Sequence, residues 1–131
     1  MAYATQQKDV ILRVLKATKQ PLTPMEICEI ARKEIPSIGI ATVYRSLKKF
    51  TEENLVRLVE VPGASPHYEH QVSTHHHFFL CQTCHKLFKL VGCVKGVKDL
   101  APENFQVTEH EIVLYGVCAE CRSENAAASE E

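Results

Sequence analysis

Two Cys-x-x-Cys pairs constrain the fold of this chain more than any other feature of its sequence. The pairs are Cys81/Cys84 and Cys118/Cys121. Two intervening residues let the backbone turn so that both thiolates of a pair face one point, and four such ligands predict a closed, tetrahedral, structural zinc site. The gap between the pairs is longer than in a zinc ribbon or finger, so a whole subdomain is expected to fold between them. Two disulfides or a redox-active Cys-x-x-Cys are the alternatives, but nothing in the sequence indicates export.

The composition indicates a small cytoplasmic protein with two functional halves. A chain of 131 residues, 45% of them hydrophobic, can bury one modest core or two small ones, and two small ones need a staple such as zinc. The N-terminus has no apolar signal region and no apolar run approaches membrane-spanning length, so no membrane partner is expected. Residues 1–60 carry ten Lys and Arg against seven Asp and Glu, whereas the remainder carries five against nine. This asymmetry indicates a nucleic-acid-binding module followed by a metal-binding module.

Residues 1–72 have the pattern of a winged helix-turn-helix DNA-binding domain. A capping box, Thr23-Pro24-Met25-Glu26, marks the start of the second helix, which is expected to bury Ile27, Ile30 and Ala31. A Pro-Gly-Ala-Ser-Pro turn joins two alternating segments that are typical of a hairpin. The helices are predicted at residues 5–17, 24–34 and 40–53, and the strands at 55–61 and 67–72.

The third predicted helix has an apolar stripe and an opposite polar face. In a winged helix this helix enters the major groove of DNA, where arginine suits guanine and lysines suit phosphates. A solvated basic face on a protein-interaction helix would give the same pattern and is the alternative. The residues expected to contact DNA are Thr42, Tyr44, Arg45, Lys48 and Lys49.

The second half, residues 73–123, is predicted to form a small α/β domain with a three-stranded sheet. Its last residues, 124–131, are polar and alanine-rich and are expected to be a disordered tail. The chain as a whole is therefore expected to be α+β. The predicted strands are residues 74–80, 86–91 and 105–114, with a short helix near 95–100.

Three groups of residues occur in a fixed order and spacing along the chain. They are Ala41-Thr42-Val43-Tyr44-Arg45, then His75-His76-His77 shortly before Cys81-x-x-Cys84, then His110 before Leu114-Tyr115-Gly116-x-Cys118-x-x-Cys121. Together they resemble the ferric uptake regulator (Fur) family of metal-dependent transcriptional repressors. The resemblance implies a homodimer with an N-terminal winged helix and a C-terminal dimerisation domain. It also implies a regulatory metal that closes the two DNA-binding arms onto a palindromic operator.

The resemblance further implies a regulatory metal site on one face of the His-rich strand. His75 and His77 share that face because alternate residues of a strand point the same way. The family adds a carboxylate and a His before Tyr-Gly-x-Cys; His110 matches this His, and the carboxylate position falls on Cys93. Three imidazoles and one thiolate favour Zn²⁺ over Fe²⁺ or Mn²⁺, so the zinc-sensing branch is favoured. A buried, apolar Cys93 beside a solvent-exposed His run is the alternative.

A second regulatory site of the family, at the hinge between the domains, is only partly matched. Glu69 and His76 correspond to two of its ligands, but Pro21 and Phe78 stand where the family has His. Iron, manganese and peroxide sensors depend on this site, so the loss of two of its ligands argues against these functions. The residues expected in a rebuilt site are Glu69, His76, His67 and His70.

The sequence therefore predicts a metal-responsive, DNA-binding repressor that senses zinc and represses metal-uptake genes. An iron, manganese or peroxide sensor of the same family is the runner-up. A zinc enzyme fits less well, because every proposed zinc sphere is already full and no small-molecule substrate is implied. A metal-storage protein would leave Arg45 without a role. In the preferred interpretation, zinc binds the DNA-competent dimer more tightly than the open one and so shifts the population between them.

Overall fold

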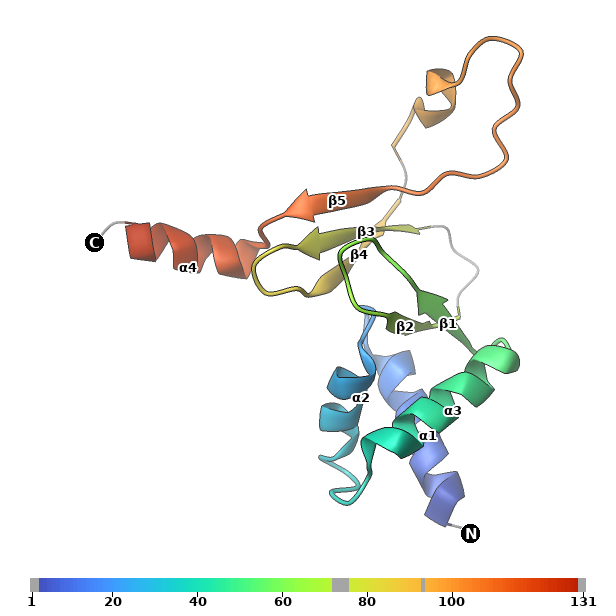
Figure 1. Cartoon of the computed structure of the whole chain (residues 1–131), viewed down its shortest axis with the longest axis vertical. Helices are drawn as coiled ribbons and strands as arrows, with labels where there is room; N and C mark the ends of the chain where they lie inside the picture. Colours follow the sequence, from blue (N-terminus) through green and yellow to red (C-terminus); the bar gives the residue numbers. More distant parts are fainter. Residues whose placement is uncertain (1–2, 72–75, 93, 130–131) are drawn as a thin grey trace. The chain divides into compact units, whose positions relative to one another are not determined.

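Three helices and a two-stranded hairpin form the first of two units, Met1–Ser73 (Figure 1). The structure is a computed structural model, and it describes residues 3–71, 76–92 and 94–129. The order of the elements confirms the predicted winged-helix half of an α+β chain. The elements are α1 (Tyr3–Ala17), α2 (Pro24–Ala31), α3 (Ile40–Glu52), β1 (Val56–Val59) and β2 (His67–His70).

The helices begin and end at local signals in the sequence. At the start of α2, the Glu26 N–H donates to Thr23 Oγ1 at 3.2 Å, and the Thr23 N–H donates to Glu26 Oε1 at 2.9 Å. These reciprocal bonds are the predicted capping box. α3 begins after Gly39 and is followed by Asn54, whose φ of 60° is the left-handed conformation that commonly ends a helix. The recognition helix is therefore positioned by its own sequence at both ends.

One apolar core holds the three helices together. Ile27 and Ala31 of α2 are buried as predicted, but Ile30 is 38% exposed. The predicted end of α2 at residue 34 is also wrong, because the residues after Ala31 continue as turns ahead of Pro36. The buried core residues are Val10, Ile11, Leu15, Leu22, Ile27, Cys28, Ala31, Ile38, Val43, Leu47, Phe50 and Val56.

The hairpin is antiparallel and has two distinct faces. Leu58 lies opposite Tyr68, and Arg57 lies opposite Glu69. Because side chains alternate along a strand, Leu58 and Tyr68 share one face while Arg57 and Glu69 share the other. A backbone bridge extends the hairpin, since the Leu22 N–H donates to the Tyr68 carbonyl at 2.9 Å and the Tyr68 N–H donates to the Leu22 carbonyl at 2.7 Å. The segment between α1 and α2 is thus tied to the hairpin at one isolated bridge.

A three-stranded mixed sheet organises the second unit, Thr74–Glu131, as predicted. The central strand pairs antiparallel with the strand that follows it and parallel with the last strand of the chain. The elements are β3 (His76–Cys81), β4 (Leu87–Val91), the 3₁₀ helix η1 (Val97–Leu100), β5 (Val113–Gly116) and α4 (Ala119–Ser129). In sheet order the strands are β4, β3 and β5.

The largest differences from the predicted boundaries in this unit concern the third strand and the C-terminal segment. The third strand begins at Val113, not at Phe105, and ends at Gly116. The first residue pair between β3 and β5 is Phe78 with Val113, so the residues before Val113 do not pair with β3. The alternating apolar residues of that segment had suggested a longer strand. The predicted disordered tail is also wrong over its described residues, because α4 continues to Ser129. An alanine-rich sequence has high helix propensity, which the polar composition of this segment obscured.

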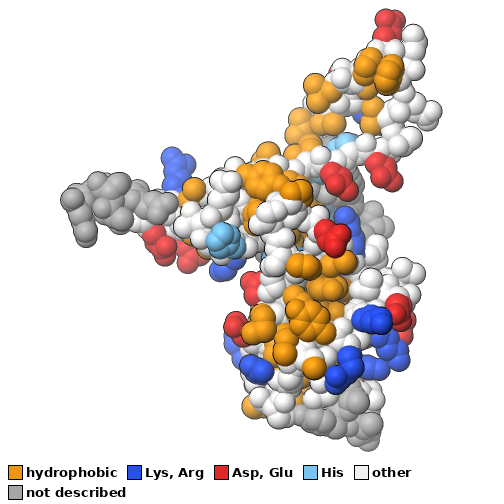
Figure 2. All heavy atoms as spheres, viewed as in Figure 1, with side chains coloured by type: hydrophobic (Ala, Val, Ile, Leu, Met, Phe, Trp, Pro, Cys, Tyr) orange, Lys and Arg blue, Asp and Glu red, His pale blue; other side chains and the backbone are white. Residues whose placement is uncertain are grey.

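The surfaces of the two units differ in character. In the view of Figure 2, Lys and Arg side chains gather over the helices of the first unit, and hydrophobic side chains are exposed on the segment between β4 and β5. In that segment Leu100 is 86% and Phe105 is 70% exposed. Over the described residues, no helix is long and apolar enough to span a membrane.

Candidate metal and DNA-binding sites

The fold brings the four paired cysteines together in the second unit. Their Sγ atoms all lie within 4.8 Å of one another. Sheet register explains this placement: Cys81, the last residue of β3, lies opposite Gly116, the last residue of β5. The second pair begins two residues after Gly116 and therefore arrives beside Cys81. Cys81 and Cys121 are buried, whereas Cys84 is exposed.

Backbone N–H groups point at the cysteine sulfurs. The N–H groups of Cys84 and Cys118 each donate to Cys81 Sγ at 3.4 Å, and the Cys121 N–H donates to Cys118 Sγ at 3.5 Å. His85, with a φ of 64°, turns the chain back after the first pair. The bond from Cys84, opposed by burial and reinforced by Cys118, lowers the pKa of Cys81 to about 5. One thiolate is therefore favoured before any metal binds.

Two of the other thiols, Cys84 and Cys121, have raised pKa values and ionise less readily than an ordinary cysteine. Burial, followed by hydrogen bonds with the neighbouring thiols, raises the pKa of Cys121 above its ordinary range. A divalent cation at the centre would stabilise all four thiolates at once and reverse that effect. The described cysteines are free thiols, so the disulfide alternative is not what this part of the chain adopts. The four-sulfur donor set fits a tetrahedral thiolate-bound metal ion.

Two of the four residues predicted for the regulatory site lie side by side in the second unit. The ring centroids of His77 and His110 are 5.0 Å apart. The Ile112 N–H donates to His77 Nδ1 at 3.2 Å, which orients this ring just before β5 begins. The neutral ring then carries its proton on Nε2, so His77 must give up this bond before it can bind a metal ion. The other two predicted residues, His75 and Cys93, lie outside the described residues. The described part of the site is thus a pair of adjacent imidazoles, a ligand type that suits zinc, copper and iron.

The polar face of α3 is open to solvent. Tyr44 is 53% exposed, and Arg45, Lys48 and Lys49 are exposed with it. Arg45 Nη2 donates to Thr42 Oγ1 at 3.1 Å, so the guanidinium lies along the outer side of the helix. A guanidinium fork has the geometry to bind a phosphate or a base edge.

Lys8 extends the basic surface from α3 to α1 and was not among the residues predicted to contact DNA. The close approach of the Lys49 ammonium, which disfavours a second positive charge beside it, lowers the pKa of Lys8. Two ammonium groups held so close favour an anion between them. Only the packing of α1 against α3 reveals this pair, because the two residues are far apart in sequence.

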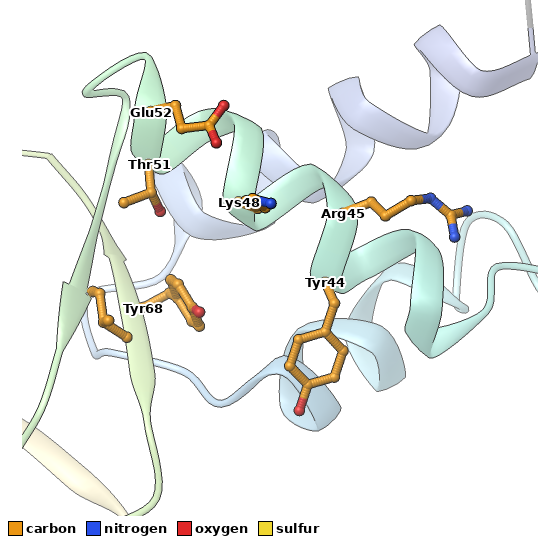
Figure 3. Close-up of a pocket in the computed structure, with 7 residues that line it drawn as sticks. Tyr44, Arg45, Lys48, Thr51, Glu52 and Tyr68 are labelled. Atoms are coloured by element: carbon orange, nitrogen blue, oxygen red, sulfur yellow. The ribbon is translucent and has the colours of Figure 1, made fainter.

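A groove of about 490 Å³ lies between α3 and the hairpin (Figure 3). Three of the residues predicted to contact DNA line it, and the Tyr68 ring points from β2 towards the helix. The lining residues are Tyr44, Arg45, Lys48, Thr51, Glu52, Leu58 and Tyr68. The contributions of Leu58 and Tyr68 were not predicted, because they depend on the register of the hairpin.

Comparison with known proteins now decides the family. A model of the ferric uptake regulator family matches residues 2–115. The chain belongs to the ferric uptake regulator family. Members of this family are metal-dependent, DNA-binding transcriptional regulators and not enzymes.

Relatives of this Fur-family protein carry names that differ in the signal to which they respond. The ferric uptake regulation protein of Campylobacter upsaliensis is 32% identical, over 89% of this chain and 78% of its own length. The peroxide-responsive repressor PerR of Staphylococcus epidermidis is 29% identical, over 92% and 81% of the two chains. The solved ferric uptake regulator of Vibrio cholerae matches with a TM-score of 0.70 at 28% identity, over 86% of this chain and 88% of that one. Family membership is thus secure, while the relatives differ in what they sense.

The residues expected in the Fur hinge site have other partners in this structure. Glu69 is 4% exposed, and its Oε1 lies 3.6 Å from Arg57 Nη1 across the hairpin. His67 is 1% exposed, and its Nδ1 lies 2.7 Å from the Ser65 carbonyl, to which it can only donate. Glu69 and His67 share a face of β2, whereas His70 lies on the opposite face. Residues of one predicted site are therefore divided between two faces of the hairpin.

The last residue of that set, His76, belongs to the second unit. It lies on the face of β3 opposite His77, and its ring packs edge-on against Phe78 with centroids 5.2 Å apart. Phe78 stands at one of the family's ligand positions, so an apolar ring contact fills a place where the family has an imidazole. The role of Arg57 beside Glu69 was missed in the sequence, because only strand register brings the two together.

Proposed function

We propose that this Fur-family protein is a zinc-responsive, homodimeric repressor of metal-uptake genes. The observation that supports the choice of zinc is the placement of His77 beside His110, with ring centroids 5.0 Å apart. With His75 and Cys93 of the same sequence pattern, these imidazoles make a donor set of nitrogen and sulfur. Such a set favours Zn²⁺ over Fe²⁺ and Mn²⁺, which prefer oxygen ligands. A second zinc, held by the four-cysteine cluster, is structural.

The regulatory zinc acts by linkage. A metal that binds the DNA-competent dimer more tightly than the other form shifts the population by that difference in affinity. Imidazole and thiol ligands must lose their protons to bind, so the zinc response weakens as pH falls. In the competent form, the exposed face of α3 reads a palindromic operator through Thr42, Tyr44, Arg45, Lys48 and Lys49.

Exposed apolar side chains on the second unit support the homodimer. Leu114 and Tyr115 of β5 are 50% and 46% exposed, and β5 lies at an edge of the described sheet. The two side chains point to opposite faces of this edge strand, and exposed large apolar residues at a sheet edge are typical of an association site. In a two-fold symmetric dimer formed through this site, each of the two copies of α3 would bind one half-site of the operator.

A sensor of iron, manganese or peroxide is the second candidate. The buried carboxylate of Glu69 favours it, as does the name of the peroxide-responsive relative from Staphylococcus epidermidis. Such a sensor would hold its metal with Glu69 and His76. The pairing of Glu69 with Arg57 weighs against a complete metal site there.

Operator affinity measured against buffered free metal tests the proposal. Fluorescence anisotropy with Zn²⁺, Fe²⁺ or Mn²⁺ is expected to give tight binding at the lowest free concentration with zinc. His110→Ala should raise the zinc concentration required by about tenfold or more, since even indirect partners of metal ligands change affinity by that much. His70→Ala changes another half-buried histidine, one expected in the hinge site of the second candidate, and should leave the zinc curve in place if the regulatory site contains His110. Response to Fe²⁺ or Mn²⁺ alone, with His110→Ala unchanged, would move the function to the second candidate.

A further inference from the structure

The groove between α3 and the hairpin has walls that the fold holds rigidly. One wall is α3, whose inner stripe is buried in the core of the first unit. The other wall is the hairpin face that carries Leu58 and Tyr68, which lie opposite each other across the two strands. Tyr68 is fixed further by its two backbone bonds to Leu22. A ligand entering this groove therefore meets a preformed surface.

The side chains along the groove change in character from place to place. Arg45 and Lys48 supply positive charge from α3, while Leu58 and the rings of Tyr44 and Tyr68 supply apolar surface. In Figure 3 the Tyr68 ring points towards α3, and Arg45 points away from the hairpin. Cations placed beside apolar surface match the alternation of phosphate and deoxyribose along a DNA strand.

Two of the hydroxyl groups that line the groove differ in their hydrogen bonding, because one can only accept a further bond and the other can donate one. Thr51 Oγ1 donates to the Leu47 carbonyl at 2.7 Å, so this oxygen has only lone pairs left to offer. Burial, with further effects from Tyr44 and Glu60, raises the pKa of Tyr68. The Tyr68 phenol therefore keeps its proton at physiological pH and can donate it to a phosphate oxygen.

We propose that this groove seats one sugar–phosphate segment of the operator, with Tyr68 donating to a phosphate and Leu58 packing on a deoxyribose. This deepens the DNA-binding role of the family and rests on it. Lys48 neutralises the phosphate from the helix side, and Arg45 stays available for a base or a neighbouring phosphate. Glu52 lies in the same groove one turn beyond Lys48, and its negative charge limits how far along α3 the phosphate strand can run.

Charge substitutions at two equally exposed leucines test this proposal. Leu58 lines the groove and Leu55 does not, yet both are 38% exposed. At saturating metal, Leu58→Glu is expected to weaken operator binding about tenfold or more. Leu58→Lys is expected to strengthen binding and to make the slope of log affinity against log salt concentration steeper by about one. Leu55→Glu and Leu55→Lys are expected to stay within about twofold of the wild type, because they lie outside the proposed path of the strand.

Removal of one hydroxyl group tests the proposed phosphate contact separately. Tyr68→Phe is expected to weaken binding to operator and to unrelated DNA by a similar factor of about tenfold, because a phosphate contact carries no sequence information. Thermal unfolding of each variant verifies that the hairpin is intact. Equal effects at Leu58 and Leu55, or unchanged binding by Tyr68→Phe, would overturn the groove assignment. Wild-type protein that fails to bind any operator with any metal would instead overturn the proposed function.

Discussion

The two units of this protein are stabilised by different means. The first unit buries apolar side chains from all three helices and β1 in one continuous core. The second buries few, namely Phe78, Leu80, Cys81, Leu87 and Cys121, and leaves larger ones such as Leu100 and Phe105 mostly exposed. A unit this small with so little apolar core needs additional stabilisation, such as a bound metal ion or association with another chain. The first unit can therefore fold by burial alone, whereas we propose that the second depends on a metal ion and on a partner surface.

Loss of one cysteine ligand is expected to produce the largest difference in folding between the two units. Cys81→Ser removes a thiolate from a site type whose zinc binding contributes about 10–16 kcal/mol in small domains. We expect the zinc of this site to be lost and the amide signals of the second unit to collapse, while those of the first unit persist. Zinc per chain by mass spectrometry and two-dimensional NMR provide the measurement.

A second buried cysteine supplies the control for that experiment. Cys28 is as fully buried as Cys81 but lies in the core of the first unit. Cys28→Ala should keep its zinc and the fold of the second unit. A Cys81→Ser protein that retains both would show that the second unit does not depend on the cluster.

Truncation of the helical core is the converse experiment and the next in size. Leu47 is fully buried, and Leu47→Ala should cost about 2–5 kcal/mol of the free energy of unfolding of the first unit. The zinc content should not change, because the cysteine cluster belongs to the other unit. Leu100→Ala, at an 86% exposed position, is the control and should cost less than about 0.5 kcal/mol in urea unfolding. Equal losses at the two positions would contradict the contrast between the units.

The exposed apolar surface of the second unit should matter for association rather than for folding. Leu114→Asp places a charge on β5 and is expected to raise the dimer dissociation constant about tenfold, or about 1.4 kcal/mol. Analytical ultracentrifugation measures this constant. Leu55→Asp in the first unit should leave it unchanged. A Leu114→Asp protein that remains fully dimeric would move the interface elsewhere.

Removal of the capping box is the smallest test, and it is confined to the first unit. Thr23→Ala eliminates the acceptor of the Glu26 N–H and should cost about 1 kcal/mol. Thr23→Ser keeps the hydroxyl and should be close to neutral. Urea unfolding monitored by signals of the first unit distinguishes the two. An effect on zinc content in either variant would indicate coupling that the division into units does not predict.

Much of this architecture could be predicted from local signals. The capping box at Thr23, the glycine before α3 and the left-handed Asn54 each determine a helix end within a few residues. The spacing of the cysteine pairs predicts a common site, because a Cys-x-x-Cys turn is itself local. The start of β5 could not be predicted in this way, since the length of a ladder depends on how much of β3 is available to it.

The missed contacts all depend on residues that are distant in sequence. Arg57 meets Glu69, and Leu58 meets Tyr68, only because of the hairpin register, which is set by the turn between the strands. Lys8 meets Lys49 only because α1 packs on α3. His67 is buried, and its bond to the Ser65 carbonyl could not be read from its position in the sequence. Long-range packing therefore decides which titratable groups are engaged.

The bridge between Leu22 and Tyr68 has a consequence for the DNA as well as for the protein. A hairpin held only by its own turn could bend to follow operators of different shape, but this one would first have to break two backbone hydrogen bonds. The operator must then supply the deformation, and its cost depends on the stiffness of base steps that no side chain touches. Two operators with identical contacted bases should consequently differ in affinity when their uncontacted steps differ in flexibility.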